Sequence, residues 1–95
     1  MGKYFVELEE RAKKEIIAHY KSGHQSSINN IKKILTELSE TPYNGTGKPE
    51  ALKHELSGFW SRRINRKDRL IYKISELTVT VLVISASGHY EKKKS

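Results

Sequence analysis

The segment LTVTVLVISA, residues 77–86, places the strongest limit on how this chain can fold. Threonines alternate with valines at its start, and the rest of the segment is apolar apart from Ser85. Alternation predicts a β-strand, and an apolar strand is stable only when both of its faces are covered. We therefore expect residues 77–86 to form a central strand of a sheet that is covered by a second layer of structure.

Two amphipathic segments earlier in the chain predict that second layer. Apolar residues recur at every fourth position in the first, which predicts a helix over about residues 8–21 that is ended by Gly23. The second helix should begin near Ser26 or Ser27, because either serine can cap a helix. It should stop before the Thr-Pro pair at residues 41–42, since a residue preceding proline avoids the α region.

Short segments with β-like patterns complete the order of elements. We expect strands over about residues 3–6, 52–56, 59–65, 68–75 and 77–86. The order β-α-α-β-β-β-β predicts a small single α+β domain, with both helices packed on one face of a mainly antiparallel sheet. The other face of the sheet should then carry the cations.

The positive charge is concentrated in the second half of the chain. Of the net charge of +7, residues 1–45 carry +1 and residues 46–95 carry +6. A basic half predicts a polyanionic target or an acidic protein partner, with binding that weakens as salt is added. The chain has no cysteine, no signal-peptide pattern and no apolar run of transmembrane length. We therefore expect a cytoplasmic protein with no disulfide, no thiolate metal site and no membrane association.

Residues 46–72, TGKPEALKHELSGFWSRRINRKDRLIY, combine two short strand patterns with a dense series of cations. Alternation in the first pattern places Trp60, Arg62 and Ile64 on one face and Arg63 on the other. The second pattern, RLIYKI, alternates in the same way, which predicts that its leucine, tyrosine and last isoleucine face the core.

Paired strands would bring a few charged groups of this segment together. Arg63 and Arg69 can converge on one surface, with Glu50 at its rim. Metal-free RNA cleavage needs a base for the 2′-OH proton, cations for the charge on the phosphate and an acid for the departing 5′-oxygen. Only Glu50, His89 and the two arginines can supply these roles together in one region.

The string GKPEALKHELSGFWSRRI, the RLIY that follows it and the His-Tyr pair at residues 89–90 resemble the YoeB/Txe toxins of the RelE/ParE superfamily. The match is gapless from about Thr41 to Tyr72, and the first forty residues match mainly in element order and length. The resemblance implies a RelE/ParE-like fold and a type II toxin that cleaves mRNA on the ribosome. It also implies an acidic YefM/Phd-like antitoxin as partner, and it allows a homodimer.

The resemblance also implies a role for individual residues. It implies Glu50 as general base, Arg69 as phosphate stabiliser, His89 as general acid and Tyr90 as an orienting or stacking group. We expect RNA or ribosome binding by a set of basic residues, namely Lys48, Lys53, Arg63 and Arg66. No metal ion or cofactor is expected.

Two other functions remain open from the sequence. One is a toxin of the same superfamily that inhibits by binding, as the gyrase-directed branch does, and the other is a basic RNA-binding module. Glu50 together with the pair at residues 89–90 favours the nuclease, because a pure binder has no use for a base and an acid. We expect residues 1–90 to form the toxin domain and residues 91–95 to form a basic tail beyond the point where similar toxins stop.

Overall fold

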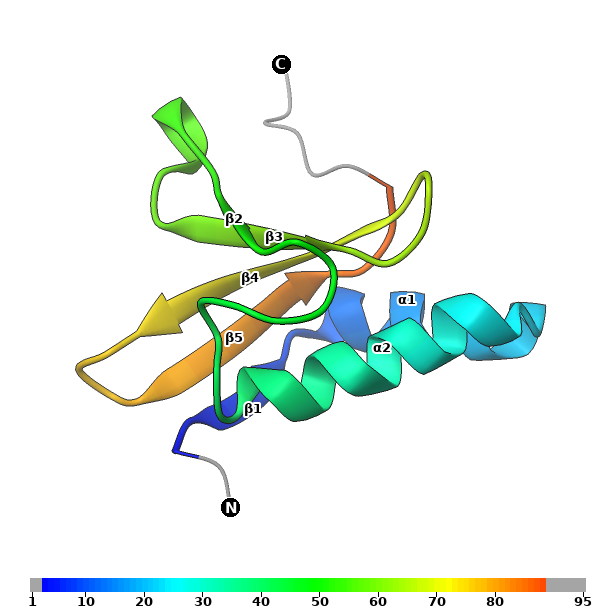
Figure 1. Cartoon of the computed structure of the whole chain (residues 1–95), viewed down its shortest axis with the longest axis horizontal. Coiled ribbons are helices and arrows are strands. Elements are labelled where there is room, and N and C mark those ends of the chain that lie inside the picture. Colours follow the sequence, from blue (N-terminus) through cyan, green and yellow to red (C-terminus); the bar gives the residue numbers. More distant parts are fainter. Residues whose placement is uncertain (1–2, 89–95) are drawn as a thin grey trace.

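The computed structural model describes residues 3–88, which form two helices beside a five-stranded sheet (Figure 1). The strands are β1 (Phe5–Leu8), β2 (Glu50–Ala51), β3 (Phe59–Arg63), β4 (Arg69–Ser75) and β5 (Thr80–Ser85). The helices are α1 (Glu10–Ser22) and α2 (Gln25–Leu38), and one short 3-10 turn, η1 (His54–Leu56), follows β2. The predicted α+β class and order of elements are confirmed.

The strands follow the order β1-β5-β4-β3-β2 across the sheet. Neighbouring strands are antiparallel except at one edge, where β1 runs parallel to β5 and Phe5 pairs with Thr80. The apolar strand β5 therefore has β1 on one side and β4 on the other. Its predicted place inside the sheet is confirmed.

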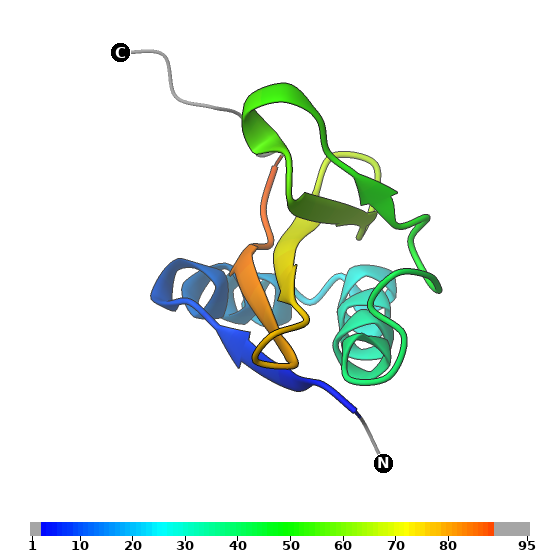
Figure 2. The same ribbon diagram turned by 90° about the vertical axis from the view of Figure 1, so that its left-hand side faces the viewer.

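Both helices pack on one face of the sheet. Tyr72 of β4 and Val83 of β5 are direct partners, so their side chains point to the same side. Both belong to a single buried cluster that also holds apolar residues of the two helices, namely Ala12, Ile16, Ile31, Ile34 and Leu38. Figure 2 shows β2 and β3 above both helices, at the far edge of the sheet.

The helices begin at positions that differ slightly from those predicted. α1 begins at Glu10 rather than at residue 8, because Leu8 still belongs to β1. α2 begins at Gln25, and no side chain caps its first turn. The predicted cap at Ser26 or Ser27 is therefore wrong, since both serines lie inside the helix.

Two predicted strands differ more strongly from the structure. Residues 52–56 do not form a strand, because β2 ends at Ala51 and His54 has a φ of 59°, which interrupts an extended chain. β2 lies at the edge of the sheet, so no neighbour on its outer side extends its pairing. β5 begins at Thr80 rather than at residue 77, because Val79 has a φ of 53° and closes the preceding turn.

Candidate functional site

Three predicted site residues lie on one face of the sheet. Glu50 of β2 pairs with Ser61 of β3, and Arg63 of β3 pairs with Arg69 of β4. Directly paired residues of antiparallel strands point to the same side, as do residues two apart on one strand. Glu50, Arg63 and Arg69 therefore lie on the face opposite the helices, as the alternation predicted. Glu50 and Arg63 are exposed, and Arg69 is half-buried.

The loop before β2 is fastened to β3 by a close backbone contact at Gly47. Its carbonyl oxygen accepts a hydrogen bond from the N–H of Arg63 at 2.7 Å. Gly47 has a φ of 87°, and a Cβ atom there would lie 2.7 Å from the carbonyl oxygen of Arg63. This position therefore requires glycine. The contact holds the next residue, Lys48, at the end of β3.

Three of the four predicted RNA-binding cations border a single groove. Lys48, Arg63 and Arg66 line a surface groove of about 330 Å³, together with other residues that include Asn65. Lys53 is exposed and lies between β2 and η1, and it is not among the residues that line this groove. The structure thus brings three of these cations together and leaves the fourth apart.

The backbone of Arg69 is tied to the last described residue of the chain. Its N–H donates to the carbonyl oxygen of Gly88 at 3.0 Å, and its Nη1 donates to the carbonyl oxygen of Asn65 at 3.4 Å. His89 and Tyr90, and the tail at residues 91–95, lie outside the described residues.

A buried carboxylate stands directly before Arg69. Asp68 accepts a hydrogen bond from the N–H of Gly88 at 2.7 Å and another from Nδ2 of Asn65 at 3.0 Å. Burial by itself raises the pKa of Asp68, but these two hydrogen bonds, together with electrostatic attraction to His19 and Lys67, outweigh it, and the pKa lies below its ordinary value. Asp68 is therefore ionised at neutral pH.

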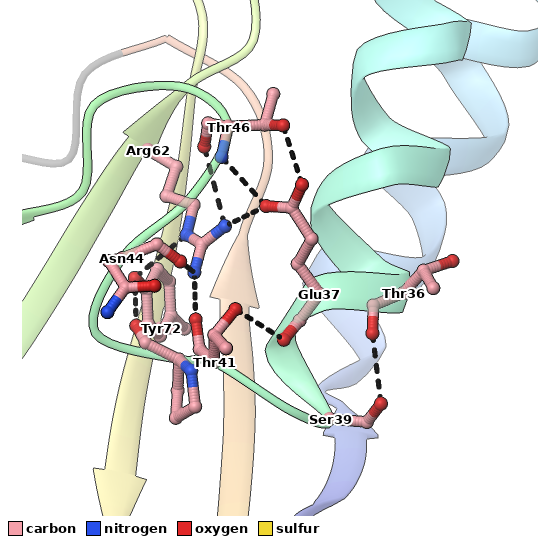
Figure 3. A network of polar contacts seen from close by, with 9 residues as sticks. Thr36, Glu37, Ser39, Thr41, Asn44, Thr46, Arg62 and Tyr72 are labelled. Carbon is pink, nitrogen blue, oxygen red and sulfur yellow. Dashed lines mark hydrogen bonds and ion pairs between the residues drawn. The ribbon is translucent and has the colours of Figure 1, made fainter. Parts of the chain in front are cut away.

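A fully buried arginine organises the loop that leads to the site (Figure 3). Arg62 donates to Oε1 of Glu37 at 2.7 Å and to the hydroxyl of Tyr72 at 3.1 Å. It also donates to three backbone carbonyls of the loop between α2 and β2, those of Thr41, Asn44 and Thr46. Arg62 thus holds this loop against β3 and β4, and the loop continues into Lys48 and Glu50.

Glu37 completes this network from the last turn of α2. Its carboxylate accepts hydrogen bonds from the N–H and the hydroxyl of Thr46, each at 2.7 Å. Burial raises the pKa of Glu37, but the hydrogen bonds from Thr46 and Arg62 and the charge of Arg62 outweigh it and lower the pKa below its ordinary value. Alternation placed Arg62 on the same face as Ile64, and the structure shows that this face is buried. A buried guanidinium needs a carboxylate partner. No pattern in the sequence indicated that Glu37 supplies it.

We expect the stability of the fold to decrease in acid because of these two carboxylates. The pKa values of Glu37 and Asp68 are both lowered by folding, so their contribution is complete above the unfolded pKa and is lost as the pH falls through the folded pKa. The urea midpoint should therefore begin to drop near the ordinary pKa values of these groups, 4.5 for Glu37 and 3.8 for Asp68, and should continue to drop as the pH falls below them. Glu37→Gln should flatten this dependence, and an unchanged slope in that variant would contradict the assignment.

Residues 3–88 contain neither a membrane-spanning helix nor a cluster of side chains that could hold a metal ion. None of their helices is long and apolar enough to cross a membrane. Within the same residues, His, Asp and Glu side chains form no group of three that could hold a metal ion.

Solved structures define the class of protein to which this fold belongs. The YoeB/ParE toxin from Agrobacterium tumefaciens matches it with a TM-score of 0.78 and 27% identity, over 90% of this chain and 99% of that one. The YoeB dimer from Staphylococcus aureus matches with a TM-score of 0.75 and 26% identity, over 93% and 99% of the two chains. The YoeB–YefM complex from the same organism matches with a TM-score of 0.73 and 26% identity, over 92% and 98%. The fold is that of the RelE/ParE-like toxins, as predicted.

Sequence comparison narrows this class to one family. Residues 10–90 match the model of YoeB-like toxins of bacterial type II toxin–antitoxin systems. Toxin YoeB of Escherichia coli strain CFT073 is 43% identical over 63 residues, which cover 66% of this chain and 73% of that protein. The chain belongs to the YoeB family of type II toxins.

Proposed function

We propose that this toxin is a ribosome-dependent endoribonuclease that cuts translated mRNA in the cytoplasm and thereby inhibits translation. The observation that carries the proposal is the sheet face that Glu50, Arg63 and Arg69 share, on which Glu50 and Arg63 are exposed. A carboxylate beside two guanidinium groups combines a proton acceptor with cations that can hold a phosphodiester. Membership of the YoeB family supports the same reading.

In the proposed mechanism Glu50 acts as general base. It takes the proton of the 2′-OH, and the 2′-oxygen then attacks the adjacent phosphorus. Arg69 stabilises the negative charge that develops on the phosphoryl oxygens. His89 acts as general acid and gives a proton to the departing 5′-oxygen, while Tyr90 orients the reacting groups or stacks on a base. The products are a 2′,3′-cyclic phosphate and a free 5′-OH, and the cycle needs no metal ion.

The basic groove provides a surface for the RNA backbone. Lys48, Arg63 and Arg66 border it, and Arg63 also lies on the face of Glu50. We assign these three residues to contacts with mRNA or ribosomal RNA phosphates, and Lys53 to a more distant contact. Each such contact adds affinity that decreases with salt.

The proposed protein partner is an acidic antitoxin of the YefM/Phd type. The Staphylococcus aureus YoeB has been solved with YefM and also as a dimer. The net charge of +7 of the present chain suits an acidic partner. We propose that such an antitoxin holds the toxin inactive and that the free toxin can form a homodimer.

Dependence on the ribosome is the direct test of the proposed function. An open site of this kind has little means of aligning a flexible RNA, and alignment of reactants can be worth about 7–11 kcal/mol. The toxin should therefore cut mRNA on translating ribosomes quickly and cut the same RNA slowly when it is free. Primer extension on matched samples with and without ribosomes measures both rates.

Two outcomes would contradict the proposal. Fast, sequence-selective cleavage of naked RNA by the pure protein would overturn ribosome dependence. Growth arrest without any mRNA cleavage would instead favour a toxin that inhibits by binding.

A further inference from the structure

The chain beyond β5 is held by hydrogen bonds that no sheet ladder provides. β5 ends at Ser85, and Ala86 follows it in a fully buried position. The N–H of Ala86 donates to Oε1 of Glu15 at 2.7 Å, and Nε2 of His19 donates to the carbonyl oxygen of Ala86 at 2.7 Å. Glu15 and His19 lie one turn apart on α1, so the helix holds both polar groups of one residue.

Gly88 is held in the same way, by hydrogen bonds to both its N–H and its carbonyl oxygen. Its N–H donates to Oδ1 of Asp68 at 2.7 Å, and its carbonyl oxygen accepts from the N–H of Arg69 at 3.0 Å. Gly88 has a φ of 63°, a conformation that suits glycine. Four hydrogen bonds therefore fix the backbone at residues 86 and 88.

Asp68 is itself held rigidly in place. It is 8% exposed, and its Oδ2 accepts a hydrogen bond from Nδ2 of Asn65 at 3.0 Å. The same Nδ2 donates to the hydroxyl of Ser27 on α2 at 2.8 Å. The side-chain oxygen of Asn65 accepts from the N–H groups of Lys67 and Asp68. An ionised, hydrogen-bonded carboxylate that is locked to a helix is a rigid acceptor for the N–H of Gly88.

From these contacts we infer that Asp68, assisted by Glu15 and His19, is a positioning residue for the C-terminal catalytic pair. The inference rests on the proposed nuclease function, in which His89 is the acid. Asp68 directly precedes Arg69 and accepts a hydrogen bond from Gly88, which directly precedes His89 in the sequence, so one carboxylate sets the spacing between Gly88 and Arg69. Asp68 touches no reacting atom in this role, and a misplacement of about 1 Å in such a site can cost a factor of about a hundred in rate.

The test is a double-mutant cycle between Asp68 and His89. Asp68→Ala should lower the single-turnover rate of mRNA cleavage at saturating ribosomes by about tenfold or more. The ribosome concentration that gives half of the maximal rate should not change. In the His89→Gln background, Asp68→Ala should have less than about a twofold further effect, because the group that Asp68 positions is already absent.

A matched control and a conservative variant separate positioning from general damage. Glu76→Gln removes another carboxylate that accepts hydrogen bonds, from Tyr4 at 2.7 Å and from Tyr43, just beyond the end of β4 opposite to Arg69. Its cleavage rate should equal that of the unaltered protein. Asp68→Asn keeps an oxygen that can accept from Gly88 but loses the acceptor for Nδ2 of Asn65, so it should recover part of the rate lost in Asp68→Ala.

The outcomes distinguish this inference from the proposed function. Equal losses from Asp68→Ala with and without His89 would show a merely structural role and overturn the inference. Unchanged cleavage in Asp68→Ala would overturn it as well, while leaving the nuclease function in place. An unaltered protein that cuts no mRNA on ribosomes would overturn the proposed function itself. If Asp68→Ala does not fold, Glu15→Ala replaces it in the double-mutant cycle with His89→Gln. Glu15 is half-buried and accepts a hydrogen bond from the N–H of Ala86.

Discussion

Glu50→Gln should lower the single-turnover rate of mRNA cleavage on the ribosome by about a hundredfold or more. The substitution keeps the shape of the side chain and removes the carboxylate that we propose takes the 2′-OH proton. Because Glu50 is exposed on the short strand β2, the fold and the affinity for ribosomes should be nearly unchanged. Primer extension at saturating ribosomes measures the rate, and sedimentation with ribosomes measures binding.

A nearby carboxylate provides the matched control for this prediction. Glu55→Gln removes the same charge from η1, the turn that follows β2, and should leave the cleavage rate within about twofold of the original. Full activity of Glu50→Gln would overturn the assignment of Glu50 as base. A comparable loss in Glu55→Gln would show that charge in this region matters, rather than proton transfer at residue 50.

Arg62→Leu should lower the free energy of unfolding by about 2–3 kcal/mol, less than for a fully buried ion pair, because the side chain of Glu37 is 31% exposed. The substitution leaves the carboxylate of Glu37 without its cation and three carbonyls of the preceding loop without their donor. Urea unfolding followed by circular dichroism measures the loss. The double variant Arg62→Leu/Glu37→Leu should recover part of it, because no uncompensated charge then remains.

Arg63 serves as the control for Arg62, since it lies next to it on the opposite, exposed side of β3. Arg63→Leu should change the free energy of unfolding by no more than about 0.5 kcal/mol. A loss below about 1 kcal/mol in Arg62→Leu would mean that the loop between α2 and β2 is held by other contacts.

Alternation and helical periodicity were sufficient to predict most of the fold, because they report directly which face of an element is buried. Tyr72 and Val83 lie in the core, as their alternation predicted. The prediction of a strand over residues 52–56 was wrong, because the local sequence pattern does not show which strands lie beside a segment. Whether an edge segment extends depends on a neighbouring strand, and β2 has one on a single side.

Part of the candidate site was predicted from the sequence, and part of it was not. The common face of Glu50, Arg63 and Arg69 followed from strand pairing and was predicted. The anchors at Glu37 and Asp68 were not predicted, since each depends on contacts between residues far apart in the chain. Hydrogen bonds from side chains to distant backbone groups leave no periodic signal, so the sequence alone could not place them.

The parallel pairing of β1 with β5 sets the order in which this molecule can be completed during its synthesis. Among residues 3–88, β5 is the only strand beside β1, so residues 5–8 find their place in the sheet only after residues 80–83 have emerged. Contacts across so much of the chain close late. A nascent chain therefore carries Glu50 and Arg69 on an unfinished sheet. Glu50 and Arg69 therefore share a complete sheet only after residues 80–83 have been synthesised.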